Sequence, residues 1–250
     1  MQLNNQYYWF KSIFTVDECK TIINLGLKTI EENKKNNISV IGTTAGDTHK
    51  QALKNAIPLN DKNLDDLKKE KTFKEKKIYV RDSEIAWINE QWIYDKVFYY
   101  LKIANKNSGW NFDYDFAENF QFTTYYPGGF YGWHSDGGSD HLSKYKRYIP
   151  GISPENNEDK KKYVENPNWI GKVRKLSLTI NLNEPEDYEG GNLKFDFGPH
   201  NENTRFYECT EIRPQGSMIV FPSFVYHQVT PITKGTRYSL VLWVLGEPFK

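Results

Sequence analysis

His134 and Asp136 have the residue types and the spacing of a metal site. They are two positions apart, so on an extended chain both side chains leave the same face and can bind one ion. A third ligand is needed, and His227 is the best candidate because it follows the apolar run 218–221. Two histidines and one carboxylate leave coordination positions open, which suits non-haem Fe(II) better than a closed zinc site. A structural hydrogen bond between the first two residues is the alternative.

Arg237 adds a second chemical feature ten residues after His227. Arg237 and Ser239 share one face of the run 238–244, if that run is a strand. A guanidinium inside a barrel needs a carboxylate, which its fork binds through two parallel hydrogen bonds. The sequence therefore predicts an anion-binding site near the metal. The alternative is a surface ion pair, which the scarcity of arginine relative to lysine disfavours.

Two helices are expected in the first third of the chain. Thr15 has Glu18 three positions later, which is the pattern of a capping box, and an apolar stripe follows from Ile22 to Ile30. A second amphipathic helix is predicted over residues 85–104, where apolar residues recur at helical spacing. The Lys-rich stretch 43–77 between them is expected to be a solvated loop.

Beyond Trp110 the pattern changes to short runs rich in aromatic and β-branched residues, broken by Gly, Pro and Asn. This pattern is typical of strands, and many strands at this spacing indicate a sandwich or a barrel. The predicted strands are residues 120–126, 175–182, 192–197, 218–221 and 238–244. The connection 137–173 is polar and long, which is typical of a functional or disordered loop.

Composition limits the class of protein. Of 250 residues, 38% are hydrophobic and 16% aromatic, so a disordered chain is excluded and one substantial domain is expected. The formal net charge is +1, which gives no overall field to attract nucleic acid or a membrane surface. Only two cysteines are present and they are far apart, which predicts a reduced protein without disulfides. Because no long apolar run is present, we expect a soluble, cytoplasmic protein without a signal peptide.

Four blocks of the sequence, which occur in the order found in the family, resemble the Fe(II)/2-oxoglutarate dioxygenases. The resemblance is to the prolyl 4-hydroxylase-like branch, which includes the bacterial PKHD-type hydroxylases. The blocks are Val80-Arg81-Asp82-Ser83-Glu84, residues 125–136, residues 176–193 with Glu189-Gly190-Gly191, and residues 214–243. The resemblance implies a mainly β fold with supporting helices: a double-stranded β-helix, which is a cupin-like jelly-roll barrel. It makes residues 1–250 one domain, with mostly helical support in 1–110 and the barrel core in 111–250.

The resemblance also assigns the site. It implies that His134, Asp136 and His227 are the catalytic ligands of Fe(II). It implies that Arg237 pairs with the distal carboxylate of 2-oxoglutarate, with O2 as cosubstrate and ascorbate (vitamin C) as a reductant. Decarboxylation to succinate and CO2 would then be coupled to hydroxylation of a C–H bond.

Four further residues match positions that contact the cosubstrate in the family. They are Tyr126, Tyr131, Ser239 and Asn181. Each could instead be a polar core residue whose hydrogen bonds are satisfied within the protein.

The expected substrate is a protein or peptide, modified on prolyl residues beneath a lid formed by residues 137–173. A tolerated surface insertion is the alternative for that loop. Hydroxylation of a free amino acid or other small molecule by the same chemistry remains open. A nucleobase substrate is disfavoured because no concentrated basic face is evident, and a binding module with a decayed metal site conflicts with the full set of ligands. A monomer or weak dimer is expected.

Overall fold

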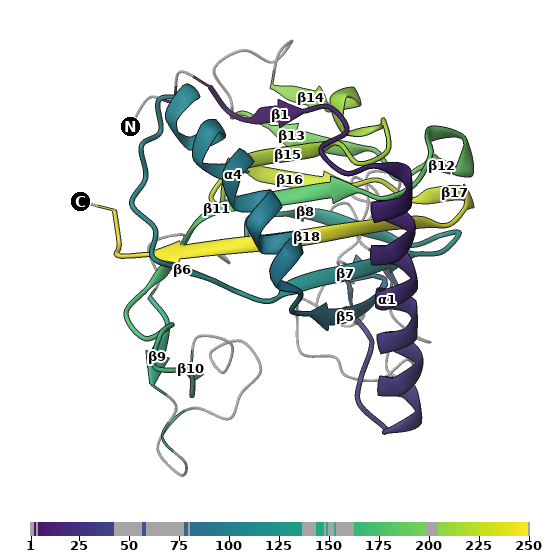
Figure 1. Ribbon diagram of the computed structural model, residues 1–250, viewed down its shortest axis with the longest axis horizontal. Coiled ribbons are helices and arrows are strands. Elements are labelled where there is room, and N and C mark those ends of the chain that lie inside the picture. Colours follow the sequence, from purple (N-terminus) through teal and green to yellow (C-terminus); the bar gives the residue numbers. More distant parts are fainter. Residues whose placement is uncertain are drawn as a thin grey trace, which may run out of the picture.

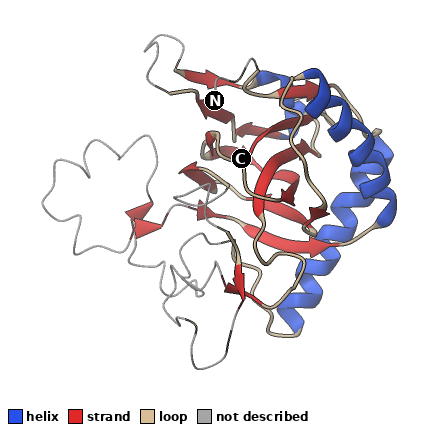
Figure 2. Ribbon diagram, turned by 90° about the vertical axis from the view of Figure 1, so that its left-hand side faces the viewer, coloured by secondary structure: helices blue, strands red, loops and turns tan. Residues whose placement is uncertain are grey.

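A computed structural model shows two β-sheets with two helices against one of them (Figures 1 and 2). The structure describes residues 3, 5–42, 57–58, 78–79, 81–136, 144–147, 149, 153, 163–198 and 205–249. Nearly all of the Lys-rich stretch 43–77 and much of the segment 137–173 lie outside these residues. The fold is the expected jelly roll, mainly β with supporting helices.

The larger sheet has seven strands in the order β1-β15-β11-β18-β7-β5, and β6 pairs with β18 at its end. Its strands are β1 (Tyr8–Phe10), β5 (Glu84–Ile88), β6 (Phe116–Ala117), β7 (Phe120–Tyr125), β11 (Val173–Asn181), β15 (Met218–Pro222) and β18 (Arg237–Gly246). Every pairing in it is antiparallel. Strands that are distant in sequence lie side by side, as the jelly roll requires.

The smaller sheet has five strands in the order β14-β13-β16-β8-β4. These are β4 (Arg81–Asp82), β8 (Phe130–His134), β13 (Leu193–Asp196), β14 (Phe206–Glu208) and β16 (Tyr226–Val229). Short two-stranded pairs are β12 (Tyr188–Gly190) with β17 (Ile232–Gly235), β9 (Lys146–Arg147) with β10 (Tyr163–Val164), and β2 (Ile57–Pro58) with β3 (Ile78–Tyr79). Single 3₁₀ turns are η2 (Pro185–Asp187) and η3 (Thr210–Ile212). All five strands predicted from the sequence are confirmed within one or two residues at each end.

Helix α1 (Val16–Lys35) begins where the capping pattern predicts. The hydroxyl of Thr15 accepts from the backbone N–H of Glu18, and the Glu18 carboxylate accepts from the N–H of Thr15 at 2.7 Å. Lys96, in the second helix α4 (Gln91–Asn107), also donates to this carboxylate at 2.7 Å. Glu18, the third residue of α1, therefore also joins the two helices.

The helix predicted over residues 85–104 is wrong at its start. Helix α4 covers Gln91–Asn107, and residues 84–88 instead form β5. The backbone of β5 pairs antiparallel with β7, and burial alternates along it, with Ala86 and Ile88 facing the core. The apolar spacing of this segment fits both a helix and a strand, and pairing with a neighbouring strand decides the outcome.

The main hydrophobic core lies between the larger sheet and the two helices. Figure 2 shows both helices on one side of the sheets. On β18, Leu240, Leu242 and Val244 belong to this core. The alternate residues of the strand, including Arg237 and Ser239, therefore face the other sheet. The interior between the two sheets therefore holds these two polar residues at one end of β18.

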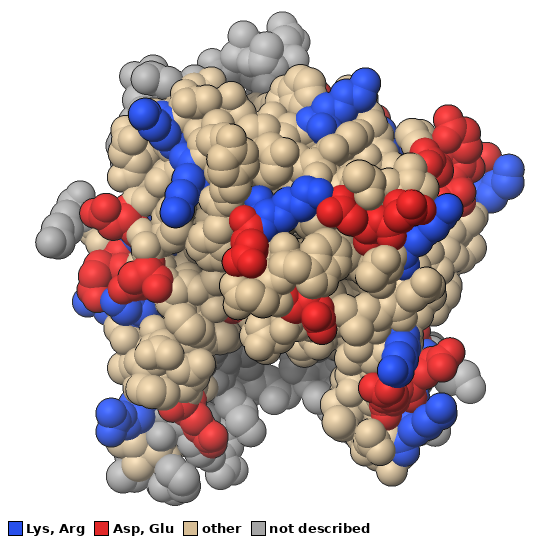
Figure 3. Space-filling model, viewed as in Figure 1, with Lys and Arg blue, Asp and Glu red and all other residues tan. Residues whose placement is uncertain are grey.

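The face with the helices carries basic and acidic side chains interspersed with one another (Figure 3). No concentrated patch of one charge is visible on that face. Among the helices in the described part of the chain, none combines the length and the apolar character needed to cross a bilayer.

Candidate active site

Three metal-ligand side chains converge between β8 and β16. His134 is the last residue of β8 and lies opposite His227 of β16 in the antiparallel register, while Asp136 follows two residues after His134. Their ligand atoms all lie within 4.8 Å of one another. The Asp136 carboxylate lies 3.6 Å from Nε2 of His134 and 3.7 Å from Nε2 of His227. Ligand atoms about 2.1 Å from one ion stand roughly 3 to 3.7 Å apart at angles of about 90–120°, so the group fits a single metal.

Both imidazoles are oriented by the backbone. Nδ1 of His134 lies 2.7 Å from the carbonyl oxygen of Gly132, and Nδ1 of His227 lies 2.9 Å from that of Val225. A carbonyl only accepts, so each Nδ1 carries the proton and each Nε2 keeps its lone pair. Such bonds fix the tautomer and the ring plane that metal coordination needs.

The protonation states also suit a cation. Burial lowers the pKa of His227 to about 4, an effect to which the charge of His134 adds. Burial alone would raise the pKa of Asp136, but the charges of His227 and His134 and the nearby Arg174 bring it well below its usual value. At neutral pH the site therefore presents a carboxylate and a neutral His227, which are the forms that bind metal.

Tyr131 lies beside the metal ligands. Its ring stacks on the imidazole of His134, with centroids 3.4 Å apart and planes 10° apart. Burial raises the pKa of its hydroxyl, so the group stays protonated at neutral pH. The Arg81 guanidinium carbon lies 4.7 Å from the Tyr131 ring centroid. Tyr131 thereby restrains the plane of one metal ligand.

Arg81 was not assigned a role from the sequence, although it belongs to the first block of the resemblance. It is 6% exposed and donates to the Ser83 hydroxyl and the Gln121 side-chain oxygen, both at 2.8 Å. Its partners are neutral, so its charge is not paired with any carboxylate among the described residues. Arginine is scarce relative to lysine in this chain, and this scarcity, which favoured a buried role for Arg237, could also have identified Arg81.

Arg237 is buried at the start of β18, only 2% exposed. Its Nε atom is buried without a hydrogen-bond partner, and no carboxylate of the described residues lies within 4.0 Å of its guanidinium. The Tyr125 ring centroid lies 5.5 Å from its guanidinium carbon. A buried, unpaired guanidinium is costly unless an anion binds to it. Arg237 therefore does not form the surface ion pair that was the alternative from the sequence, as far as the described residues show. Its guanidinium could instead bind the carboxylate of a bound molecule.

An aromatic and aliphatic wall connects the metal ligands with Arg237. Its members are Tyr125, Tyr188, Val229 and Ile232, with Tyr131 packed against them. Gly191 borders this wall at a φ of +60°, and a Cβ there would overlap Ile232 and come within 3.0 Å of Cδ of Arg237. The wall can exclude water from a molecule that reaches from the metal to the arginine.

The remaining predicted residues have different surroundings. Ser239 is 2% exposed and pairs with Asn181 across β18 and β11. The Asn181 amide nitrogen donates to the carbonyls of Asn183 and Arg213, at 2.9 and 2.7 Å. Its side-chain oxygen accepts from the Tyr188 hydroxyl at 3.3 Å, so both ends of the amide are already bonded within the protein.

Tyr126 is 45% exposed, and its hydroxyl donates to Glu84 at 3.1 Å. No described contact joins it to the metal ligands or to Arg237. The neighbouring Tyr125 is the tyrosine beside Arg237, because the two residues are directly paired across β7 and β18. The end of β7 lies opposite the start of β18, and no pattern within either segment indicates this pairing.

Only parts of the predicted lid, residues 137–173, are described. Tyr145 lies beside Trp169, with ring centroids 5.3 Å apart, and β9 pairs in parallel with β10. The backbone of Tyr145 also bonds to Lys172 and Gly171. The rest of the predicted lid lies outside the described residues.

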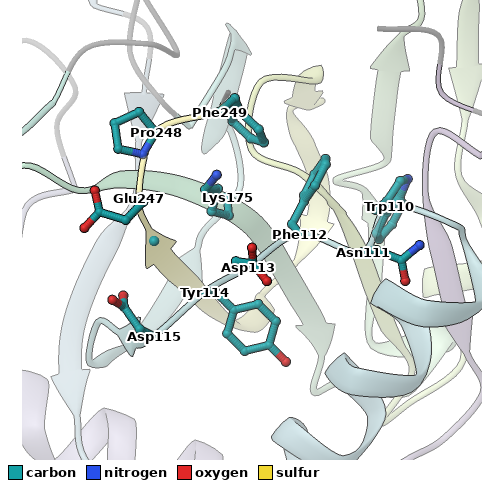
Figure 4. A pocket seen from close by; sticks show the side chains of 11 residues that line it. Trp110, Asn111, Phe112, Asp113, Tyr114, Asp115, Lys175, Glu247, Pro248 and Phe249 are labelled. Atoms are coloured by element: carbon teal, nitrogen blue, oxygen red, sulfur yellow. The ribbon is translucent and has the colours of Figure 1, made fainter.

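A separate cavity of about 360 Å³ lies beside the start of β11 (Figure 4). It is lined by residues 110–115, Lys175 and residues 246–249. The Lys175 ammonium lies over the ring of Phe249, 3.7 Å from its centroid. None of the predicted site residues lines this cavity, so it is distinct from the metal-ligand group.

Comparisons with known proteins agree with this geometry. A family model described as the 2OG-Fe(II) oxygenase superfamily matches residues 120–245, just over half of the chain. A PKHD-type hydroxylase of Synechococcus sp. (strain JA-2-3B'a(2-13)) is 39% identical over 69 residues, 28% of each chain. Another PKHD-type hydroxylase, of Picosynechococcus sp., is 33% identical over 104 residues, 42% of each chain. The chain thus spans less than half the length of these curated relatives.

Among solved structures, the viral collagen prolyl hydroxylase from Paramecium Bursaria Chlorella virus-1, in its 2OG complex, is similar over 97% of both chains. The TM-score is 0.55 and the identity is 16%. At that identity the likeness shows the fold alone, and it supports the jelly roll.

Proposed function

Because the chain belongs to the 2OG-Fe(II) oxygenase superfamily, whose cofactors are Fe(II), 2-oxoglutarate and O2, we propose that it hydroxylates a protein or peptide on prolyl residues. One observation carries the oxygenase chemistry: the interior that holds His134, Asp136 and His227 also holds the unpaired guanidinium of Arg237. A metal site alone would fit many reactions. A metal site with a buried cation fits a cosubstrate that has a chelating end and a carboxylate end.

Each residue has a definite part in this chemistry. His134 and His227 would hold Fe(II) through Nε2, and Asp136 through its carboxylate. Bound Fe(II) and 2-oxoglutarate supply an oxidation of a C–H bond by O2 that is coupled to decarboxylation to succinate and CO2. Arg237 would hold the distal carboxylate of the cosubstrate and so set its orientation. Tyr131 keeps the His134 ring in place, and the wall beside Arg237 excludes water.

The substrate proposal draws on the relatives and on the fold. The relatives over 28–42% of the chain are named PKHD-type hydroxylases, and the solved structure of the same fold is a collagen prolyl hydroxylase. The second name favours a prolyl residue in a polypeptide, in line with the prolyl 4-hydroxylase-like resemblance of the sequence. A free amino acid or another small molecule is the second candidate, because the same iron chemistry would serve it. The lid formed by residues 137–173 stays part of this proposal.

Mass spectrometry of a panel of proline-containing peptides tests the substrate. We expect a gain of one oxygen on proline that requires Fe(II) and 2-oxoglutarate. Matched peptides with alanine in place of each proline serve as controls and should stay unmodified. Oxidation of free amino acids, with no change in any peptide of the panel, would favour the small-molecule candidate.

A further inference from the structure

Asp136 is the metal ligand that the sheet itself does not hold. His134 and His227 lie in paired strands, whereas Asp136 comes two residues after the end of β8. Two hydrogen bonds at its backbone fix it within the described residues. Its N–H donates to the carbonyl of Ser223 at 2.9 Å, and its carbonyl accepts from Nη1 of Arg174 at 2.9 Å.

Arg174 is itself held rigidly. Its Nε and Nη2 atoms donate to the two carboxylate oxygens of Glu118 at 2.6 and 2.7 Å, which is the bidentate geometry of a strong pair. The guanidinium carbon also lies 4.1 Å from the ring of Trp243. The planar group thus has a carboxylate at one edge, an indole at its face and the Asp136 carbonyl at the remaining nitrogen.

Glu118 is in turn anchored to the larger sheet. Its side chain is 1% exposed, its backbone N–H donates to the carbonyl of Trp243 at 3.0 Å, and its carbonyl accepts from the hydroxyl of Tyr94 at 3.0 Å. A carboxylate that is fixed at its backbone and doubly bonded at its side chain cannot shift without breaking several bonds. It therefore holds the guanidinium of Arg174, whose backbone lies in β11 of the same sheet, in one position.

We propose that Glu118 and Arg174 are positioning residues that hold the metal ligand Asp136 in place through its backbone carbonyl. This inference rests on the proposed function, because it assumes that Asp136 binds the metal. Neither residue needs to touch the metal. Residues that orient metal ligands typically change metal affinity about 10- to 100-fold when they are replaced.

Binding of Mn(II) to the metal-free full chain, followed by electron paramagnetic resonance, tests the proposal without turnover. Arg174→Lys keeps a positive charge beside Glu118 but replaces the planar fork, which spans both Glu118 oxygens and the Asp136 carbonyl, with a single nitrogen. Glu118→Gln removes the charge that anchors Arg174. We expect both variants to bind Mn(II) roughly 10- to 100-fold more weakly than the wild type, and the spectrum of the bound ion to change.

Lys172→Ala is the matched control, because Lys172 is a cation two residues away that pairs with Asp115 and Glu247 and not with Asp136. It should bind Mn(II) as the wild type does. Thermal unfolding of each metal-free variant identifies misfolding, and affinity is compared well below its midpoint. Wild-type affinity in both folded variants would overturn the proposal, even if their KM for a peptide rose. A wild type that binds no Mn(II) would instead contradict the proposed function itself.

Discussion

His134 and His227 lie directly opposite each other on neighbouring antiparallel strands, with ring centroids 4.2 Å apart. Opposed residues of two strands point to the same side of a sheet. A slip of one residue in this register would turn one imidazole to the other side. The pairing of β8 with β16 therefore brings two distant histidines together as two of the three metal ligands.

Arg237→Gln should separate cosubstrate binding from stability. Loss of a charge-assisted hydrogen bond costs about 1.5 to 3 kcal/mol, so we expect the KM for 2-oxoglutarate to rise roughly 10- to 100-fold. The metal-free variant should be at least as stable as the wild type, because a buried and unpaired cation is removed. Steady-state kinetics and thermal unfolding measure the two effects.

Arg205→Gln is the control for that substitution, since Arg205 pairs with Asp196 near the surface at 2.8 Å. It should leave the KM for 2-oxoglutarate unchanged. An Arg237 variant that is strongly destabilised and keeps a normal KM would show that the side chain has only a structural role.

Gly191→Ala should weaken 2-oxoglutarate binding in addition to straining the backbone. An alanine at a φ of +60° costs roughly 1 to 2 kcal/mol, and its methyl group would in addition overlap Ile232 and press on Arg237. Gly109→Ala is a matched control at a φ of +72° with nothing within 4 Å of the added atom. We expect a loss of 2-oxoglutarate affinity only for Gly191→Ala, measured by titration calorimetry. Equal behaviour of the two variants would show that the space beside Gly191 is not needed.

Gly26→Ala tests how helix α1 packs on the larger sheet. Helix propensity alone would stabilise the protein by about 1 kcal/mol, but the added methyl group would overlap the ring of Phe122. Overpacking of this kind costs about 1 to 3 kcal/mol. We therefore expect chemical denaturation to show a lower free energy of unfolding. An increase would mean that the helix can move away from the sheet at little cost.

Local patterns were sufficient for much of the fold and part of the site. The capping box of α1, the strand alternation of β18 and the spacing of His134 and Asp136 all depend on neighbours in sequence. These features follow from single-segment geometry. They allowed the buried position of Arg237 to be predicted before its surroundings were known.

What the sequence did not reveal depends on pairing between distant segments. The predicted helix begins at residue 85 because the apolar spacing of residues 85–88 fits a helix as well as a strand, and pairing with β7 makes them a strand. Tyr125 faces Arg237 because of the register between β7 and β18. The Glu118–Arg174 pair joins a loop before β7 to β11, and no spacing rule relates two such positions.

Formation of succinate from 2-oxoglutarate in the absence of any substrate tests the central claim most directly. We predict slow, Fe(II)-dependent succinate formation by the wild type. His134→Ala should abolish it, because the variant loses one of three metal ligands while His227 and Asp136 remain. No iron-dependent succinate from the wild type, or undiminished succinate from the folded variant, would contradict the assignment of this site.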